Sequence, residues 1–554
     1  MNGREKNVRV AGRAISPGLV IGNAFVYREK VEVLAGLCDI EEHQIEFELQ
    51  RIERAAESVA EDLRISARRI EADANAKLAS IFEAHEAMLQ DPVLRQEIRE
   101  LVKEELISAA HALGRVFRRR ERKFRGMAGQ THRQHADDVA DLRRRLLREM
   151  AGVKTTPLEK MPPGRVLVAR RLLPSDTVAL PRCTVVGIVV ECAGPGSHAA
   201  LLAEALGIPT VAQIPNVTER VAEGDLLVVD GLRGEMVINP DGAMQARYEE
   251  EIRGAQARCA RIRQSAREPA RTLDGSTVAV LANVGCREDV VAAADQGADG
   301  VGLCRLEQFY LSRTTPPSVA ELLAELRVMF APVKGKPITV RLLDLGGDKP
   351  LPFLKLPEED NPFLGRRGVR FLLRYPELLD TQLRVLFQYS QEQNVRILVP
   401  MVTLAADMVR VQSRLAVITN HQGQGKLPPL GAMIETPAAA LTVSEIKAHA
   451  DFLSVGTNDL TQYTLAAGRE NQMVSEYYIE DHPSVLRLVR IITEEAGGLP
   501  VSVCGELARQ LNIIPTLLKQ GIRILSVAPP LVPGVKEAVR QTVLSQPVEA
   551  LDFS

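Results

Sequence analysis

GAMIETPAAALTVSEIKAHADFLSVGTNDLTQYTLA, residues 431–466, contains two short apolar runs, GAMI and FLSVG, separated by an intervening segment. Each run is apolar along its whole length, which is typical of parallel strands that are buried on both faces. Polar residues follow both runs: Glu435 comes after the first, and Asn458 and Asp459 come after the second. The stretch therefore predicts two parallel strands with chemically useful side chains at their carboxyl ends.

The same alternation extends in both directions from this stretch. The candidate strands are TVAVLANV (277–284), GVGLC (300–304), ITVRLLD (338–344), VRILVPM (395–401), GAMIE (431–435), FLSVG (452–456), VSVC (501–504) and RILSVA (523–528). Eight such strands with helices between them predict a (β/α)₈ TIM barrel over residues 271–554. In such barrels the chemistry lies in the loops that follow the strands.

The first half of the chain has a different pattern of apolar residues and glycines. Apolar runs punctuated by glycine at 1–30 and again from 162 onward indicate strands and turns, whereas 39–150 is rich in Ala, Leu, Glu and Arg with helical spacing. We therefore predict a multidomain α/β protein. An α/β domain (1–30 plus 151–242) is interrupted by a helical bundle (31–150), and a charged linker helix (243–270) leads into the barrel.

Composition narrows the class of protein. The chain has 554 residues, with 69 Lys and Arg against 71 Asp and Glu, so its net charge of −2 favours neither nucleic acid nor membrane surfaces. It lacks an apolar run of the roughly 18 residues that a membrane span needs, and its start is charged, unlike a signal peptide. Seven scattered cysteines argue against a disulfide framework or structural zinc site. We expect a cytoplasmic location.

The residues after the candidate strands are rich in arginines and carboxylates. They are Arg305, Glu307, Arg341, Asp344, Arg367, Glu435, Asn458, Asp459, Arg469, Cys504 and Glu506. Guanidinium forks match phosphate oxygens, and two carboxylates can hold a Mg²⁺ ion that also contacts a phosphate. Any one of these charges is more often a solvated surface group, and a lone cysteine is more often a small buried residue. Their joint placement favours a phosphate-ligand site.

These motifs carry a family resemblance. GVGLCRLE, RLLDLGGDK, NPFLGRRGVR, IETPAA, SVGTNDLTQYTLA and CGELA resemble the barrel of Enzyme I of the bacterial phosphoenolpyruvate (PEP)-dependent sugar phosphotransferase system. SPGLVIGNAF near the start and HADDVADLRRRLL at the end of the helical region are similar to Enzyme I as well. The resemblance implies phosphoryl transfer from PEP to a histidine of this chain and then to a histidine of an HPr-like carrier protein, with release of pyruvate.

The resemblance also implies a role for each matched residue. Arg305, Arg341, Arg469 and Asn458 would bind PEP, Arg367 would assist, Glu435 and Asp459 would bind Mg²⁺ beside the substrate, and Cys504 would be the acid that protonates the enolate of pyruvate. That acid must be a thiol and not a thiolate. The family further implies a homodimer formed through the barrel.

His198, in CAGPGSHAALLAEALGIPT, is the expected phosphocarrier. A neutral imidazole accepts a phosphoryl group well, and the start of a helix suits the resulting charge. A rival interpretation is a dinucleotide fingerprint made by Gly194, Gly196 and Ala199. That fingerprint requires an acidic residue after the next strand, where PTVAQIPN has none.

Several positions depart from the family pattern. Ala193, Gly196 and Leu173 replace residues of the motifs around the histidine, and Leu306 and Leu342 replace threonines of the barrel. Lost hydroxyl groups weaken the orientation of His198 or of phosphate, so specialised activity is expected. Three rivals stay open: a PEP-sensing regulatory paralogue, a PEP synthase or dikinase relative, and an unrelated barrel lyase or aldolase.

The helical region carries a basic run, RRRERKFR at 118–125. Its ordinary interpretation is a solvated helix face. Its functional interpretation is a contact for the carrier protein, whose surface should then be acidic or neutral there.

Overall fold

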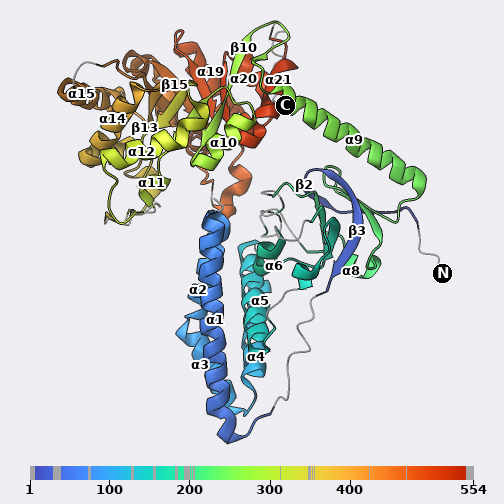
Figure 1. Cartoon of the computed structure of the whole chain (residues 1–554). Coiled ribbons are helices and arrows are strands. Elements are labelled where there is room, and N and C mark those ends of the chain that lie inside the picture. The colour runs from blue at the N-terminus through green and yellow to red at the C-terminus, as the bar shows by residue number, and fades with distance from the viewer. Residues whose placement is uncertain are drawn as a thin grey trace. The chain divides into compact units, whose positions relative to one another are not determined.

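The computed structural model describes residues 6–28, 39–72, 76–126, 130–153, 157–180, 185–192, 206–311, 313–346, 359–422, 425–469 and 471–544, and residues 197, 200, 203, 351, 353, 354, 356 and 357. The chain forms two compact units, residues 1–256 and 257–554 (Figure 1). None of the helices in these described ranges is both long and apolar enough to cross a membrane. The predicted domain boundaries stay predictions.

The second unit is a closed barrel of parallel strands. In order they are β10 (Thr277–Val284), β11 (Val301–Arg305), β12 (Ile338–Arg341), β13 (Val395–Val402), β14 (Leu430–Ile434), β15 (Phe452–Gly456), β16 (Val501–Cys504) and β17 (Ile524–Val527). Each strand pairs with the next, and β10 pairs with both β11 and β17, which closes the ring. The eight predicted strands are confirmed. Strands β12 and β14 end earlier than predicted, so Asp344 and Glu435 lie in the loops beyond them.

Helices cover the outside of the barrel. The longer ones are α10 (Arg287–Asp295), α12 (Val319–Phe330), α14 (Pro376–Ser390), α15 (Ala405–Gln422), α19 (Pro483–Glu495) and α21 (Val532–Arg540), and α18 (Thr457–Leu465) follows β15 directly. Helix α12 begins with a capping box in which Ser318 and Glu321 bond each other's backbone amides. The strands are buried on both faces, as their continuous apolar sequences require.

The first unit contains a mixed sheet. Its strand order is β1 (Val8–Ala11), β8 (Glu235–Ile238), β7 (Leu226–Asp230), β3 (Leu19–Tyr27), β4 (Arg165–Ala169), β5 (Gly187–Val190), β6 (Thr210–Ala212) and β2 (Arg13–Ser16). Strands β3 to β6 run parallel, whereas the others pair antiparallel. Strands β1, β2 and β8 were not predicted because each has only four residues, too few for a clear alternation.

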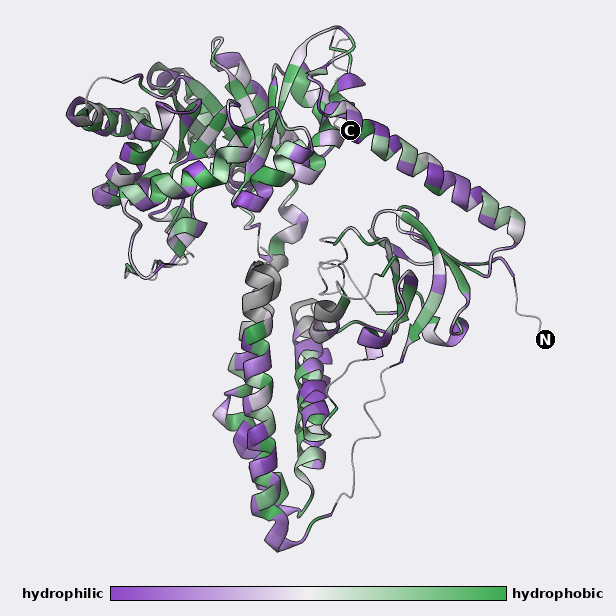
Figure 2. Cartoon of the chain, in the orientation of Figure 1, coloured by the Kyte–Doolittle hydropathy of each residue, from purple (hydrophilic) through white to green (hydrophobic). Residues whose placement is uncertain are grey.

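Helices make up the rest of the first unit. They are α1 (Ile45–Ala72), α2 (Ala76–Leu89), α3 (Pro92–Glu104), α4 (Ala109–Arg125), α5 (Gln130–Met150), α6 (Pro174–Ala179), α8 (Val217–Arg220) and α9 (Gly242–Ser265), which extends into the second unit. Helices α1 to α5 bury a shared apolar core that includes Leu63, Leu113 and Leu142, which confirms the predicted helical insertion. In Figure 2 hydrophobic residues follow the strands, whereas α5 and α9 carry many hydrophilic residues.

Candidate functional site

The carboxyl ends of the barrel strands bring the predicted residues of the second unit together. Arg305 and Arg341 are paired residues at the ends of β11 and β12, and Cys504 ends β16. Glu435 directly follows β14, and Asn458 and Asp459 lie in the first turn of α18 after β15. Because all strands of a parallel barrel point the same way, these side chains share one mouth.

Carboxylates hold two of the arginines in place. The Nη2 atom of Arg341 donates to Glu307 Oε1 at 2.6 Å, and its Nη1 atom lies 3.3 Å from Asp344 Oδ2. Burial alone would lower the pKa of Arg341, but the neighbouring Glu307 and Asp344 outweigh it and raise that pKa above its ordinary value. Arg341 is therefore a permanent cation of fixed orientation.

Arg367 links two acidic loops. Its Nη2 atom donates to Asp344 Oδ2 at 2.8 Å, and its Nη1 atom donates to Asp459 Oδ1 at 2.8 Å. The Tyr463 hydroxyl accepts a further bond from Arg367 Nη1 at 3.3 Å and donates to the Phe363 carbonyl at 2.5 Å. These contacts fix the Asp459 carboxylate and place a cation beside it.

Arg305 has a different environment. Burial of its guanidinium lowers its pKa first, and the neighbouring cations Arg341 and Arg469 lower it further. Three arginines thus concentrate positive charge at one side of the mouth. Guanidinium groups gathered at such a place attract an anion with several oxygens, such as a phosphate or a carboxylate.

Glu435 lies among the other carboxylates of the mouth. Its side chain is 2% exposed, and its Oε1 atom accepts a bond at 2.6 Å from the amide of Met401, whose φ of 55° lies in the left-handed region. Burial, and then repulsion from Asp459 and Asp344, raises the pKa of Glu435 to about 8. Crowded carboxylates of this kind suit a cation.

The donor set fits a hard divalent cation such as Mg²⁺. Glu435 and Asp459 offer hard carboxylate oxygens, which Mg²⁺ prefers, and within the described part of the chain no three His, Cys, Asp or Glu side chains form a complete metal cage. Mg²⁺ is commonly held by one or two carboxylates with the remaining ligands from water and substrate phosphate. Gly456 leaves room for this geometry, because a Cβ atom there would lie 2.6 Å from Glu435 Oε2.

Cys504 faces the same mouth from β16. Its Sγ atom lies 3.3 Å from the Ser454 hydroxyl and 3.5 Å from the Val455 carbonyl. Burial raises the pKa of the Cys504 thiol, and Glu435 adds to the effect while the Ser454 hydroxyl opposes it. The side chain is therefore a protonated thiol at neutral pH, as the predicted acid requires.

The Asn458 amide is fixed by the next loop. Its Oδ1 atom accepts from the Glu506 backbone amide at 2.8 Å, which turns the NH₂ group toward the remaining space. Gly505 makes this possible, because its φ is +133° and a Cβ atom there would lie 2.8 Å from Asn458 Oδ1. The Arg469 backbone amide donates to Gln462 Oε1 at 3.1 Å, so the loop that carries Arg469 is tied to α18.

Two residues of this site were missed by the sequence analysis. Ser454 lies inside an apolar strand, where a single serine gives no signal, and Tyr463 lies in a helix among other polar residues. Tyr463 could have been marked by its place four residues after Asp459 on α18, since residues four apart share a helix face, whereas nothing in the sequence marks Ser454. Glu307 and Asp344 were recognised as charged neighbours, and their task of holding arginines became visible only from the contacts.

His198 lies outside the described residues, and so do Ala193 and Gly196. Leu173, the third departure from the motif, is fully buried and stands directly before α6. Its amide donates to Asp176 Oδ2 at 2.9 Å. Leu173 is thus part of the apolar core of the first unit, and its side chain offers no hydrogen bond to a nearby imidazole.

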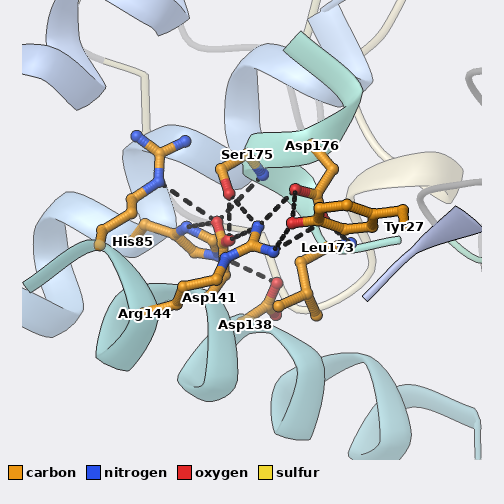
Figure 3. Close-up of polar contacts among 9 residues, drawn as sticks. Tyr27, His85, Asp138, Asp141, Arg144, Leu173, Ser175 and Asp176 are labelled. Carbon is orange, nitrogen blue, oxygen red and sulfur yellow. Dashed lines mark hydrogen bonds and ion pairs between the residues drawn. The ribbon is translucent and has the colours of Figure 1, made fainter. Parts of the chain in front are cut away.

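A buried ionic network holds α6 against the helical bundle (Figure 3). Arg144 of α5 pairs with both oxygens of Asp176 at 2.9 Å and with Asp141 Oδ1 at 3.0 Å, and it also donates to the Ser175 hydroxyl. The Tyr27 hydroxyl donates to Asp176 Oδ1 at 3.1 Å and accepts from Arg144 Nη1 at 3.0 Å.

His85 joins the network from α2. Its Nε2 atom lies 3.0 Å from Asp138 Oδ1, and its Nδ1 atom lies 3.8 Å from Asp141 Oδ2 (Figure 3). Asp141 loses its water on burial, but Arg145, Arg144 and other partners outweigh that cost and lower its pKa to about 2. The network therefore links β3, α2, α5 and α6. Because its charged groups are buried, water cannot take the place of a partner that is lost.

Comparison with known proteins identifies the family. The model of the PEP-binding domain of PEP-utilising enzymes matches residues 259–544, more than half of the chain. The models of the N-terminal and mobile domains of the same enzymes match residues 11–134 and 161–234. A phosphoenolpyruvate-protein phosphotransferase of Geobacillus stearothermophilus is 34% identical over 536 residues, which are 95% of this chain and 91% of that protein. The chain belongs to the Enzyme I family of phosphoenolpyruvate-protein phosphotransferases.

Other members of the Enzyme I family are similar to this chain as well. A phosphoenolpyruvate-protein phosphotransferase of Haloferax volcanii is 37% identical over 84% of this chain and 82% of its own. An NMR solution structure of Enzyme I (nEIt) covers 45% of this chain and 99% of its own, with 32% identity and a TM-score of 0.38, which is too low to support an argument about the fold. The predicted activity, PEP-protein phosphotransfer, and the predicted fold class are confirmed.

Proposed function

We propose that this Enzyme I transfers the phosphoryl group of PEP to His198 and from there to a histidine of an HPr-like carrier. The observation that supports the barrel half of this proposal is the mouth itself, where Arg305, Arg341 and Cys504 face the acidic pair Glu435 and Asp459. Phosphoryl transfer needs mainly positioning and neutralisation of charge, and this arrangement supplies both.

The arginines would bind and orient PEP. Arg305, Arg341 and Arg469 would take its phosphate and carboxylate oxygens, and the NH₂ group of Asn458 would donate to the phosphate. Arg367 would keep Asp459 in position rather than contact the reacting atoms, which its two 2.8 Å contacts with Asp344 and Asp459 support. The Glu307 and Asp344 carboxylates would keep the Arg341 guanidinium oriented for its contact with PEP.

Glu435 and Asp459 would hold Mg²⁺. When bound, the ion supplies positive charge to the transferred phosphoryl group. The crowding that raises the pKa of Glu435 to about 8 supports this assignment, because a cation between the carboxylates would relieve it.

Cys504 would complete the reaction in the barrel. As the bond between the phosphorus and the enol oxygen of PEP breaks, the phosphorus bonds to a His198 nitrogen and the enolate of pyruvate remains. The Cys504 thiol gives its proton to C3 of that enolate, and pyruvate leaves. The raised pKa of Cys504 supports this role, because a thiolate has no proton to give.

The helical insertion would dock the carrier protein. Arg118, Arg119, Arg122 and Lys123 are exposed on α4, which supports a carrier whose facing surface is acidic or neutral. A homodimer through the barrel and a cytoplasmic location complete the proposal.

Labelling with PEP tests the phosphocarrier. The full-length chain is incubated with PEP labelled in its phosphate, plus Mg²⁺, and the acid-labile label on the protein is counted. Wild type and His43→Ala, which removes an exposed histidine, should become labelled, whereas His198→Ala should not. Label on His198→Ala would refute the assignment, no label on any form would favour a PEP sensor, and labelling that needs ATP would favour the dikinase branch.

A further inference from the structure

A cavity lies at the end of the barrel opposite to the PEP-binding mouth. Its volume is about 530 Å³, and it opens where strands β13, β14 and β15 begin. Cavities that bind small molecules commonly measure about 300–1,000 Å³, so this one is large enough for a metabolite. Nothing in the proposed transfer reaction uses it.

The cavity combines apolar walls with isolated charges. Leu415 of α15, Leu430 and Phe452 line it together with prolines at the starts of the strands. The Arg396 guanidinium lies over the Phe452 ring, 5.9 Å from its centre. Among the residues that the structure describes, Arg396 has no ion-pair partner, unlike Arg341 and Arg367 at the opposite end.

An acidic group lines the same cavity. Asp451 accepts a hydrogen bond from the Leu430 amide at 2.7 Å through Oδ2, which leaves its Oδ1 atom able to accept another. No ion pair joins Asp451 to Arg396 in the part of the chain that is described, although both line one cavity. A cation and an anion that line one cavity without pairing with each other can bind the negative and the positive end of one small ligand.

We propose that this cavity binds a small zwitterion with an apolar body, such as an aliphatic α-amino acid. Its carboxylate pairs with the fork of Arg396, and its ammonium group donates to Asp451. Its hydrocarbon side chain covers Leu427, the exposed apolar residue of the lining. A plain carboxylate would leave the Asp451 charge unpaired beside it, and a plain amine would leave Arg396 unpaired, so the pair of charges selects a ligand that carries both.

Isothermal titration of the full-length chain with leucine tests the proposal. Isocaproate has the same carbon skeleton without the ammonium group, and isoamylamine has it without the carboxylate. Leucine should bind, and each analogue should bind at least ~10-fold more weakly, because one charge-assisted hydrogen bond is worth about 1.5–3 kcal/mol. This comparison uses wild-type protein alone, so it does not depend on the folding of a variant.

Variants then locate the site. Arg396→Gln and Asp451→Asn should each weaken leucine binding at least ~10-fold. Arg410→Gln is the matched control, since Arg410 is an exposed arginine on α15 that does not line the cavity, and it should bind as wild type does. Excess PEP with Mg²⁺ should leave leucine binding intact, because the mouth lies at the other end of the strands.

Four results would overturn the proposal. The first is an absence of heat with leucine up to its solubility limit, which would make the cavity a water-filled gap in the end of the barrel that serves stability. The second is equal binding of isocaproate, and the third is unchanged binding by Arg396→Gln. The fourth is displacement of leucine by PEP, which would place it in the mouth.

Discussion

Replacement of Arg144 by methionine should loosen the first unit. The Arg144 side chain is 1% exposed, and it pairs with Asp141 and Asp176, both fully buried. Methionine keeps most of the volume and removes the charge. Two carboxylates then stay buried without the cation that neutralises them, and the Tyr27 and Ser175 hydroxyls lose a donor.

The expected loss follows from these contacts. Removal of one partner of a buried ion pair costs about 3–5 kcal/mol, because the remaining charge is desolvated and unpaired. Arg145 still lies 3.3 Å from Asp141 and offsets part of that cost, whereas Asp176 has no second arginine among the contacts described for it. We therefore expect the lower end of the range, about 3 kcal/mol.

Hydrogen exchange of the full-length chain measures this loss, because a multidomain chain does not unfold in one step. A loss of about 3 kcal/mol should reduce the protection of backbone amides in α5 and α6 by roughly 100-fold. Arg148→Met is the matched control, since Arg148 lies on the same helix with no ion pair described for it, and it should change protection little. A loss in Arg144→Met below ~1 kcal/mol, or an equal loss in Arg148→Met, would refute the reasoning.

Three further predictions concern acid, catalysis and the metal site. Because the pKa of Asp141 is about 2 in the folded chain and near 4 when unfolded, it contributes about 2–2.5 kcal/mol that is present above pH ~4 and lost as the pH falls through 2. Between pH 4 and 2 the free energy of unfolding of wild type, from urea titrations followed by circular dichroism at each pH, should therefore fall more steeply than that of Asp141→Asn; equal slopes in the two proteins would contradict it. Cys504→Ala should keep PEP affinity within a few-fold and slow pyruvate formation by ~10²–10⁴-fold in a lactate dehydrogenase-coupled assay. Ser454→Ala, which removes the hydroxyl beside the thiol, should slow pyruvate formation far less. A full rate in Cys504→Ala would show that another group supplies the proton. Gly456→Ala should push Glu435 aside and cost about 1–3 kcal/mol, seen as a higher Mg²⁺ requirement for labelling by PEP, while Gly242→Ala, where a Cβ atom meets open space, should leave that requirement unchanged; equal requirements in all three proteins would contradict the proposed metal site.

Much of the barrel could be predicted because its signals are local. Each strand is a continuous apolar run bounded by polar residues, so Val395–Val402 or Phe452–Gly456 can be recognised from a few adjacent letters. Several residues of the mouth could be predicted for the same reason, since Arg341 and Cys504 end strands and Glu435 directly follows one. Strands β1 and β2 could not, because they pair with β8 and β6, which lie far away in the sequence, and β8 is itself a short edge-side strand that β1 completes.

Pairings between side chains could not be predicted from the sequence. Arg367 and Asp459 are 92 residues apart, and Arg144 and Tyr27 are 117 apart, so no periodicity connects them. The expected role of Arg367 toward substrate stays a prediction, whereas its contacts with Asp344 and Asp459 could be found only from the structure.

The order of strands, helices and strand-end residues was determined by the sequence alone, because backbone propensity and apolar periodicity act over a few residues. Which carboxylate neutralises which arginine, and which charges stay unpaired in a cavity, was decided only when the barrel closed and the helices packed. Those outcomes depend on distances between segments that are remote along the chain, and only tertiary packing sets such distances.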